Sequence, residues 1–426
     1  MRLVYCLVYY LCIPLILLRQ LWRARFDRRH LARLPERFGF VRPLTGEHQQ
    51  LWIHTVSVGE FLGALPLIQR LLARENCELI VTSMTLTGSE RIRHALGDRV
   101  QHFYMPYDLP GAVRRFIRRV DPDLLVIMET ELWPNTLAAC RELGVPSLLV
   151  NARLSERSAR GYARLPGFTA EMLSDLSRAA VQQRADAERF HALGLAQDKT
   201  QVTGNIKFDI EIGGELRSQA AVLKSQWSVG GRRLIWMVAS THAGEDEIIL
   251  ETLTKLRRAG IDAGRLLLAL VPRHPERFER VAALIAERGF TLERRSGGAT
   301  PPPGVDVLLG DTMGEMKLLF GASDIVFMGG SLVDVGGHNF IEPAVWARPL
   351  LSGPVLHNFT EVSKLLIEAG ALQVVQGSED LATALQALVE DESLRLAGGR
   401  AALQVAEANR GALDRTLGVI DSMLQP

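Results

Sequence analysis

The sequence predicts an α/β protein with two doubly wound, Rossmann-like domains, preceded by a hydrophobic N-terminal helix. Three observations lead to this prediction. Apolar runs of strand length alternate with helical segments along most of the chain. These runs are continuous rather than alternating, as expected for parallel strands covered on both faces. The chain has 426 residues, of which 47% are hydrophobic, so it can bury more than one core.

The first element is an uncharged segment from Leu3 to Leu18, LVYCLVYYLCIPLILL, followed by seven arginines between Arg19 and Arg37. It lacks a strong basic start and a small-residue cleavage site, and the arginine block resists export, so it does not resemble a cleaved signal peptide. A buried core helix is the alternative, because 16 residues fall short of the usual spanning length. We predict a membrane anchor over 1–20, short-spanning or half-inserted. The basic segment 21–45 would face anionic headgroups.

The two domains are predicted at 46–206 and 221–426, joined by a linker at 207–220 that is polar and contains glycines. Strands are expected in the first domain at 51–56, 78–83, 102–105, 123–129, 147–151, 178–182 and 201–203. In the second domain they are expected at 233–239, 265–271, 305–309, 324–328, 349–352 and 372–375. Ligands of such sheets bind at the carboxyl ends of the strands, so the residues that follow each strand are the candidates.

Composition and motifs exclude several classes of protein. The net charge of +1 gives no field that would attract nucleic acid. Neither a Walker lysine motif nor Gly-x-Gly-x-x-Gly occurs at the first strand–helix junction, which argues against an ATPase or a dehydrogenase. The four cysteines have no spacing typical of disulfides or a zinc site, which is consistent with a cytoplasmic body and no bound metal.

Three strand ends in the second domain indicate a nucleotide site. LVPRHPERF brings Pro272 and Arg273 to a strand end, and VLLGDTMGEM turns into a helix near Gly314 and Glu315. FMGGSLVDVGGHNFIEP is rich in glycine, with Asn339 as a predicted N-cap and Glu342 one turn into the helix. Such turns let a phosphate approach backbone N–H groups, and a carboxylate there can accept hydrogen bonds from a ribose. Each feature also has a structural explanation, such as pairing of Arg273 with Glu276.

Acidic residues follow the strands of the first domain. Glu60 lies in TVSVGE, where a strand turns into a helix, and Glu129 and Glu131 lie in METELWPN. Lys207, in VTGNIKFD, follows the last strand. This combination suits proton abstraction from a hydroxyl, with a cation balancing the charge of a leaving group. A structural cap or a partner to a nearby arginine is the alternative for Glu129 and Glu131.

Taken together, the motifs SVGE, METELWPN, NARLSERS, TGNIKFD, LVPRHPERF, GDTMGEM and GGSLVDVGGHNFIEP resemble the 3-deoxy-D-manno-octulosonic acid (Kdo) transferase family almost from end to end. The resemblance implies a GT-B glycosyltransferase at the cytoplasmic face of the bacterial inner membrane. It implies transfer of Kdo from CMP-Kdo to the lipid A precursor (lipid IVA), in one or more units and with inversion, without a required metal or cofactor.

Residue roles follow from the same resemblance. It implies that Glu60 is the general base and that Glu129 and Lys207 stabilise the transition state. The helix N-terminus is expected to lower the pKa of Glu60 and keep it ionised. The implied contacts to the CMP of the donor are Pro272, Arg273, Met313, Gly314, Glu315, Asn339, Phe340, Ile341 and Glu342. Glu131 and Asp334 receive no role.

Two other functions compete with this interpretation. One is a GT-B enzyme that uses a UDP-sugar and a lipid acceptor, which competition by UDP rather than CMP would reveal. The other is a membrane-attached nucleotide-binding scaffold without catalysis, for which substitution of Glu60 would change nothing measurable.

Overall fold

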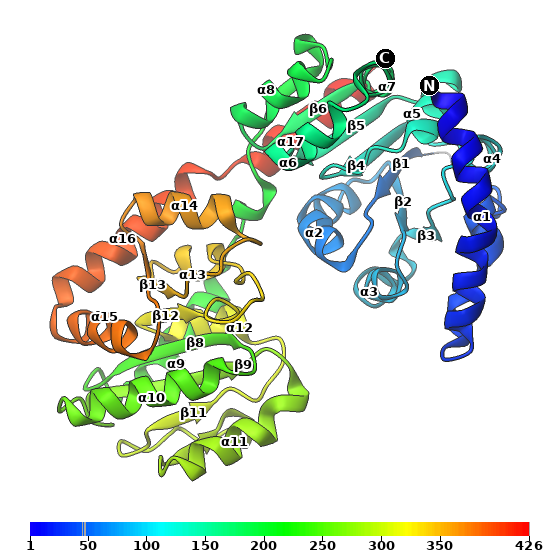
Figure 1. Ribbon diagram of the computed structural model, residues 1–426. Coiled ribbons are helices and arrows are strands. Elements are labelled where there is room, and N and C mark those ends of the chain that lie inside the picture. The colour runs from blue at the N-terminus through cyan, green and yellow to red at the C-terminus, as the bar shows by residue number, and fades with distance from the viewer. Residues whose placement is uncertain (45, 47, 426) are drawn as a thin grey trace. The chain divides into compact units, whose positions relative to one another are not determined.

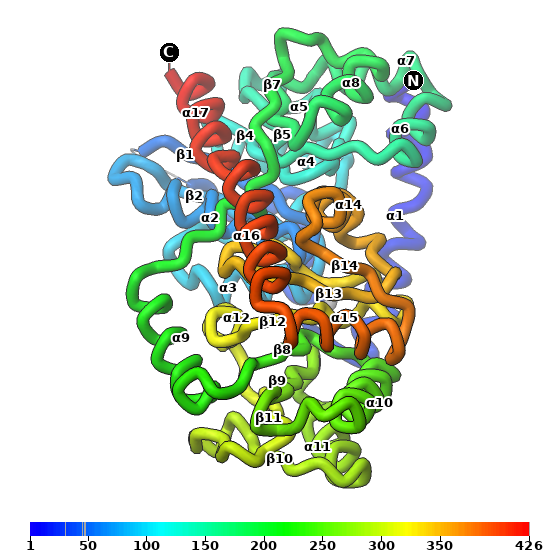
Figure 2. The backbone as a smooth tube through the Cα atoms, turned by 90° about the vertical axis from the view of Figure 1, so that its left-hand side faces the viewer, coloured from blue at the N-terminus to red at the C-terminus, as the bar shows by residue number. Residues whose placement is uncertain are grey.

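The described part of the computed structural model, residues 1–44, 46 and 48–425, forms two compact units. Unit 1 comprises Met1–Asp209 with Arg410–Pro426, and unit 2 comprises Ile210–Asn409. The sequence-based division assigns all of 221–426 to the second domain. The structure differs because the C-terminal helix α17 (Ala412–Leu424) returns to unit 1 and packs beside α2 (Figure 2). The predicted boundary between the basic segment and the first domain, at residues 45 and 46, cannot be compared at residue 45, because residues 45 and 47 lie outside the described ones.

Unit 1 is built on one parallel sheet with the strand order β3-β2-β1-β4-β5-β6-β7. Its strands are β1 (Gln49–His54), β2 (Cys77–Ser83), β3 (Gln101–Tyr104), β4 (Leu124–Met128), β5 (Ser147–Ala152), β6 (Arg178–Val181) and β7 (Thr200–Val202). Its remaining helices are α1 (Arg2–Ala24), α2 (Val58–Leu72), α3 (Leu86–Leu96), α4 (Pro110–Val120), α5 (Pro134–Glu142), α6 (Glu156–Tyr162), α7 (Pro166–Ser174) and α8 (Arg184–Ala192).

Both faces of this sheet are buried, as the apolar strands predicted. Successive side chains of a strand point to opposite faces, and Trp52 accordingly belongs to one hydrophobic cluster while Leu51 and Ile53 belong to another. All three side chains are fully buried. The helices therefore cover the faces of the sheet, and the turns at the carboxyl ends of its strands are left for function.

Unit 2 repeats this architecture with the strand order β10-β11-β9-β8-β12-β13-β14, again entirely parallel. Its strands are β8 (Leu234–Thr241), β9 (Leu266–Pro272), β10 (Leu292–Arg294), β11 (Val307–Leu309), β12 (Ile325–Met328), β13 (Leu350–Ser352) and β14 (Leu372–Val374). Its helices are α9 (Gly214–Trp227), α10 (Glu245–Arg258), α11 (Phe278–Glu287), α12 (Met316–Ala322), α13 (Ile341–Ala344), α14 (Thr360–Glu368), α15 (Ser378–Glu390) and α16 (Glu392–Ala408).

Helix α1 lies against the side of unit 1, close to α4 and α5 (Figure 1). The Tyr5 hydroxyl donates to Asp108 Oδ2 at 3.0 Å, and the Cys6 thiol donates to Asn135 Oδ1 at 3.1 Å. The apolar side chains of Tyr9 and Ile13 pack on a small cluster formed by Tyr107, Leu109 and Ala112. None of the residues of α1 is buried, so the core-helix alternative is wrong. The helix is long and apolar enough to cross a membrane, and it exposes most of its leucines.

Candidate active site

Glu60 lies in the first turn of α2, beside the carboxyl end of β1. Ser57 is the N-cap of this helix, and its hydroxyl accepts a hydrogen bond from Glu60 N at 3.4 Å. In return, Glu60 Oε2 accepts from Val56 N at 2.7 Å and Oε1 accepts from the Ser57 hydroxyl at 3.2 Å. This reciprocal pattern is a form of capping box, and it fixes the direction of the carboxylate.

The expected lowering of the pKa of Glu60 is wrong. Burial raises the pKa of this carboxyl, and the nearby charge of Glu129 raises it further, against the lowering effect of the hydrogen bonds from Val56 and Ser57. Removal from water therefore outweighs the helix N-terminus. A carboxylate with a raised pKa is a stronger base, which suits proton abstraction near neutral pH.

Glu129 and Lys207 form a direct ion pair, with Lys207 Nζ 3.3 Å from Glu129 Oε1. Arg153 Nε lies 3.3 Å from the other oxygen of the same carboxylate. Glu129 directly follows β4 with a positive φ of 57°, which turns the chain sharply at the end of the strand. The alternative of an arginine partner therefore holds for Glu129, which also pairs with Lys207.

Asn151, at the end of β5, positions Lys207. The Asn151 side-chain oxygen accepts a hydrogen bond from Ile206 N at 3.1 Å, which fixes the turn that carries the lysine. The Lys207 side chain then runs along α2, where a Cβ on Gly63 would lie 3.6 Å from its Cε. Gly63 comes three residues after Glu60 on the same helix. The Lys207 ammonium group therefore approaches the acidic cluster along α2.

Glu131 completes the acidic cluster. Burial raises its pKa to about 7, and the charges of Glu60 and Glu129 contribute to the increase. No hydrogen bond or ion pair engages its carboxylate within the described residues. Strands β1, β4 and β5 are neighbours in the sheet, so the turns after them bring Glu60, Glu131 and Arg153 to one edge.

The corresponding edge of unit 2 carries Arg273 directly after β9. Its guanidinium is exposed and makes no ion pair among the described residues, so the proposed pairing with Glu276 is wrong; His274 is the residue near Glu276, at 4.0 Å. Three histidines that the sequence analysis missed surround this position. His242 Nε2 lies 3.0 Å from His338 Nε2, and the rings of His242 and His274 are 5.5 Å apart. They follow β8, β9 and β12, three neighbouring strands.

The segment after β11 exposes Met313, and Gly314 has a positive φ of 85°. Glu315 is held by both nitrogen arms of Arg295, at 2.8 and 3.1 Å. The hydrogen bond from Arg295 lowers the pKa of Glu315 below its usual range. Glu315 is therefore ionised, and its N–H group lies at the start of α12.

The predicted cap at Asn339 is present in a modified form, because its Oδ1 accepts from Ile341 N at 3.1 Å while Phe340 occupies the N-cap position of α13. The side chains of Phe340 and Ile341 are fully buried, which leaves only backbone groups of these two residues for a ligand. Glu342 is half-buried, and burial raises its pKa against the effects of Lys317, Asn339 and Arg273. Asp334 is exposed.

The glycine-rich loop after β12 uses its own N–H groups internally. The fully buried Glu245 accepts hydrogen bonds from Gly330 N at 2.7 Å and from Ser331 N and Leu332 N at 3.0 Å. A Cβ on Gly329 would lie 2.7 Å from the carbonyl oxygen of Ser240. The start of this loop is therefore shaped by close backbone packing, and Glu245 occupies the N–H groups that were expected to meet a phosphate.

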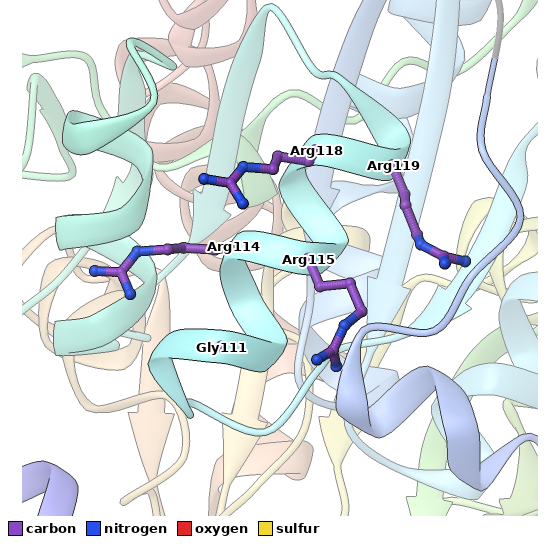
Figure 3. A pocket seen from close by; sticks show the side chains of 5 residues that line it. All are labelled: Gly111, Arg114, Arg115, Arg118 and Arg119. Carbon is purple, nitrogen blue, oxygen red and sulfur yellow. The ribbon is translucent and has the colours of Figure 1, made fainter.

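Two hollows in unit 1 are lined by arginines. One, of about 660 Å³, is bordered by Gly111 and by Arg114, Arg115, Arg118 and Arg119 of α4. Figure 3 shows Arg114 and Arg118 on one side of this helix and Arg115 and Arg119 on the other. The second, of about 500 Å³, is bordered by Gly161 and by Arg157, Arg160 and Arg164 at α6. No group of three or more His, Cys, Asp or Glu in the described chain is arranged to hold a metal.

Comparison with known proteins agrees with the motifs. The family model described as 3-deoxy-D-manno-octulosonic-acid transferase (kdotransferase) matches residues 32–210. The chain is 40% identical to 3-deoxy-D-manno-octulosonic acid transferase of Haemophilus influenzae, over 100% of this chain and 99% of that protein. It is 38% identical to the Bordetella pertussis transferase of the same name, over 88% of this chain and 87% of that protein.

Among solved structures, Acinetobacter baumannii MurG covers 88% of this chain and 99% of its own at a TM-score of 0.58 and 13% identity. A UDP-GlcNAc 2-epimerase from Neisseria meningitidis matches 88% of this chain and 99% of its own chain, with a TM-score of 0.57 and 14% sequence identity. These similarities confirm the predicted GT-B fold. The relatives that match along the chain identify it further: the chain belongs to the 3-deoxy-D-manno-octulosonic acid transferase family and is a glycosyltransferase of lipopolysaccharide biosynthesis.

Proposed function

We propose that this protein transfers Kdo from CMP-Kdo to the lipid A precursor, with inversion, at the cytoplasmic face of the inner membrane. The observation that carries the proposal is the acidic cluster of unit 1, in which Glu60 and Glu131 lie beside the Glu129–Lys207 ion pair. Catalysis of glycosyl transfer to a hydroxyl needs a base at the acceptor, and unit 1 supplies one with a raised pKa.

In the proposed reaction, Glu60 takes the proton of the acceptor hydroxyl as its oxygen attacks the anomeric carbon of Kdo. The bond from that carbon to the phosphate oxygen breaks, and CMP leaves with the electron pair. Lys207 offsets the negative charge that develops, and Glu129 holds the lysine in place through the ion pair. This division of roles agrees with the geometry of the capping turn, which directs the Glu60 carboxylate.

Unit 2 would bind the CMP part of the donor. The unpaired Arg273 offers a guanidinium to the phosphate, and Glu342 offers a carboxylate to the ribose. The N–H groups near Gly314 and Glu315 and the backbone groups of Asn339, Phe340 and Ile341 complete the proposed set, with Met313 and Pro272 as apolar contacts. A phosphate on Arg273 would also favour protonation of the adjacent His242 and His338, whose pKa values burial lowers.

We further propose that α1 lies half-inserted in the membrane surface. One side of the helix is fastened to unit 1 by Tyr5 and Cys6, while Leu3, Leu7, Leu11, Leu15 and Leu18 are exposed. An apolar stripe next to a docked face is typical of a helix that lies in the interface. Arg19, Arg23, Arg25 and Arg28 are exposed and available to anionic headgroups, whereas Arg37 is buried and donates to the backbone oxygen of Met84.

The function is tested by mass analysis of the lipid formed from CMP-Kdo and the lipid A precursor in neutral detergent. Addition of one or more Kdo masses is expected, and CMP should inhibit the reaction while UDP should not. Inhibition by UDP alone, with no Kdo-containing product, would instead support the UDP-sugar alternative. If the protein binds the nucleotide but forms no product, the result would support the non-catalytic scaffold.

A further inference from the structure

The arginine cluster at α6 has no partner in the protein. Arg157, Arg160 and Arg164 are exposed, and none of them makes an ion pair or a side-chain hydrogen bond in the described part of the chain. Arg157 and Arg160 lie three residues apart on one side of the short helix α6, and Arg164 follows in the turn after the helix ends at Tyr162. Ala159 and Tyr162, on the opposite side, pack against the core of unit 1. The guanidinium groups are therefore presented outwards together, around the 500 Å³ hollow.

The arginines of α4 show that such clusters can be neutralised internally. Arg114 pairs with Glu142 at 2.6 Å, and Arg115 and Arg119 donate to the backbone oxygens of Phe38 and Val41, each at 2.6 Å. Only Arg118 of that group lacks such a contact within the described residues. Because like charges at this spacing repel, three unpaired arginines at α6 indicate a binding site for an anion from outside the chain.

The position of α6 connects this cluster to the acidic one. Strand β5 pairs with β4, with Met128 opposite Val150, and α6 begins a few residues beyond the end of β5. Arg153, in the intervening turn, reaches Glu129 at 3.3 Å. The charge of Glu131 also adds to the effect of burial in raising the pKa of Tyr162, on the inner side of α6. Helix α6 therefore lies near the proposed catalytic carboxylates of the same unit through Tyr162, and the arginines lie on its outer side.

Arginine clusters match phosphate groups, because the planar guanidinium donates two parallel hydrogen bonds to phosphate oxygens. An apolar surface continues from the arginines along the chain. Leu165 follows Arg164 and is 50% exposed, and the ring of Phe168 in α7 lies 5.8 Å from that of Tyr5 in α1. A ligand that covers this surface would carry phosphate at the arginines and acyl chains toward the apolar N-terminal helix.

We propose that Arg157, Arg160 and Arg164 bind a phosphate group of the acceptor lipid and so place its hydroxyl at the acidic cluster. This subsite rests on the proposed function, which supplies an amphiphilic acceptor to unit 1. It assigns acceptor recognition to α6 and leaves the donor to unit 2.

The test compares two double variants with the same spacing and the same loss of charge, Arg160→Gln/Arg164→Gln and the control Arg114→Gln/Arg118→Gln. Equilibrium binding is measured without donor, in neutral detergent that provides no anionic lipid surface. The probes are the lipid A precursor and the same lipid after phosphatase treatment. The wild type is expected to bind the phosphorylated lipid roughly tenfold to hundredfold more tightly than the treated one. The α6 variant should lose this preference and the α4 variant should keep it.

Unchanged preference in the α6 variant would overturn the subsite, as would an equal loss in both variants, which indicates general charge attraction. Melting temperatures of both variants check that unit 1 remains folded. Turnover is measured separately with CMP-Kdo. If the wild type shows the phosphate preference but forms no Kdo product, the proposed function fails and the subsite stands. If the wild type is active and the α6 variant has an unchanged acceptor KM, the subsite alone fails.

Discussion

The two units have the same sheet architecture, yet the carboxyl edges of their sheets leave opposite charges without a partner. In unit 1, the turns after β1 and β4 carry Glu60 and Glu131, and neither has a cation at ion-pair distance in the described chain. Burial raises the pKa of both, and the charge of Glu129 adds to the increase in each. Lys207 and Arg153, the cations near these two carboxylates, both pair with Glu129 instead.

In unit 2 three carboxylates near this edge have partners, and Glu342, whose pKa burial raises, is the exception. Glu245 accepts backbone N–H groups, Asp246 pairs with Arg277, and Glu315 pairs with Arg295. Arg273 is exposed and makes no ion pair within the described residues. Burial lowers the pKa values of its neighbours His242 and His338, that of His338 to about 4.

This difference shows how one fold can present two different chemistries through the turns that follow its strands. An edge with free carboxylates can take a proton from a hydroxyl, whereas an edge with a free cation and neutral imidazoles can receive a phosphate. The strands of both units have similar apolar sequences, because each strand is buried on both faces of its sheet. Function is encoded in the few residues that follow each strand.

The largest expected effect comes from removing the basic oxygen of Glu60. In Glu60→Gln, turnover should fall by about 10²–10⁴-fold while CMP affinity is retained, because the nucleotide is assigned to unit 2. The raised pKa of Glu60 also predicts that activity is lost as pH falls through a value above the usual glutamate range. The Gln variant should lack this acidic limb in a pH–rate profile.

Ser57→Ala is the matched control, because it removes the cap partner of Glu60 and keeps the carboxylate. It should cost about 0.5–2 kcal/mol of folding stability. Turnover should fall far less than in Glu60→Gln, because the hydrogen bond from Val56 N still directs the carboxylate. Equal losses of turnover in the two variants, at equal melting temperatures, would show that Glu60 acts only as a structural cap.

The second test separates Lys207 from its partner. Lys207→Met should lower turnover by roughly 10²–10³-fold if the ammonium offsets charge in the transition state. Its contribution to stability should be within about 1 kcal/mol, since the pair is partly exposed. A double-mutant cycle with Glu129→Gln measures the coupling in both turnover and stability. A cycle in which the two variants affect stability alone would remove Lys207 from the proposed mechanism.

The third test addresses the cationic edge of unit 2. Arg273→Ala should weaken CMP binding by about 1.5–3 kcal/mol, the range for hydrogen bonds to a charged group. Calorimetry with CMP measures this directly. Arg232→Ala removes an exposed arginine from the same unit and should leave the affinity unchanged. Identical dissociation constants for all three proteins would mean that the unpaired charge of Arg273 has no role in nucleotide binding.

The architecture could be predicted because burial leaves a continuous apolar signature in each long strand. Strand β10 was not predicted, since Leu292–Arg294 is three residues long, half-buried and mostly polar. The placement of α17 could not be predicted either. The apolar positions Leu417 and Ile420 are visible in the sequence, but nothing local indicates that they join the core of unit 1.

The acidic residues at the strand ends were predicted as candidates, but their electrostatics were not. The N-terminal position of Glu60 suggested a lowered pKa, because the helix dipole is a local feature of the sequence. Burial and the charge of Glu129 depend on the folded surroundings and reverse the direction. The internal ligand of the glycine-rich loop, Glu245, lies 85 residues before Gly330 and was missed for the same reason.

The smallest effect concerns the stability of the acidic edge itself. A carboxyl whose pKa is raised in the folded protein binds more protons there than in the unfolded chain, so the stability of the fold decreases as pH rises through that window. For Glu131 the window runs from the ordinary glutamate value of 4.5 to about 7. The Glu131→Gln variant should lose this dependence and gain on the order of 1–2 kcal/mol over the wild type at pH 8, with little difference at pH 4. Urea unfolding at both pH values measures this difference in stability.

Glu315→Gln is the contrasting control in unit 2. Arg295 lowers the pKa of Glu315, so removal of this carboxylate should destabilise the protein at pH 8. If both variants were destabilised to the same extent at pH 8, the acidic edge would not be under electrostatic strain, and the contrast between the two units would be lost.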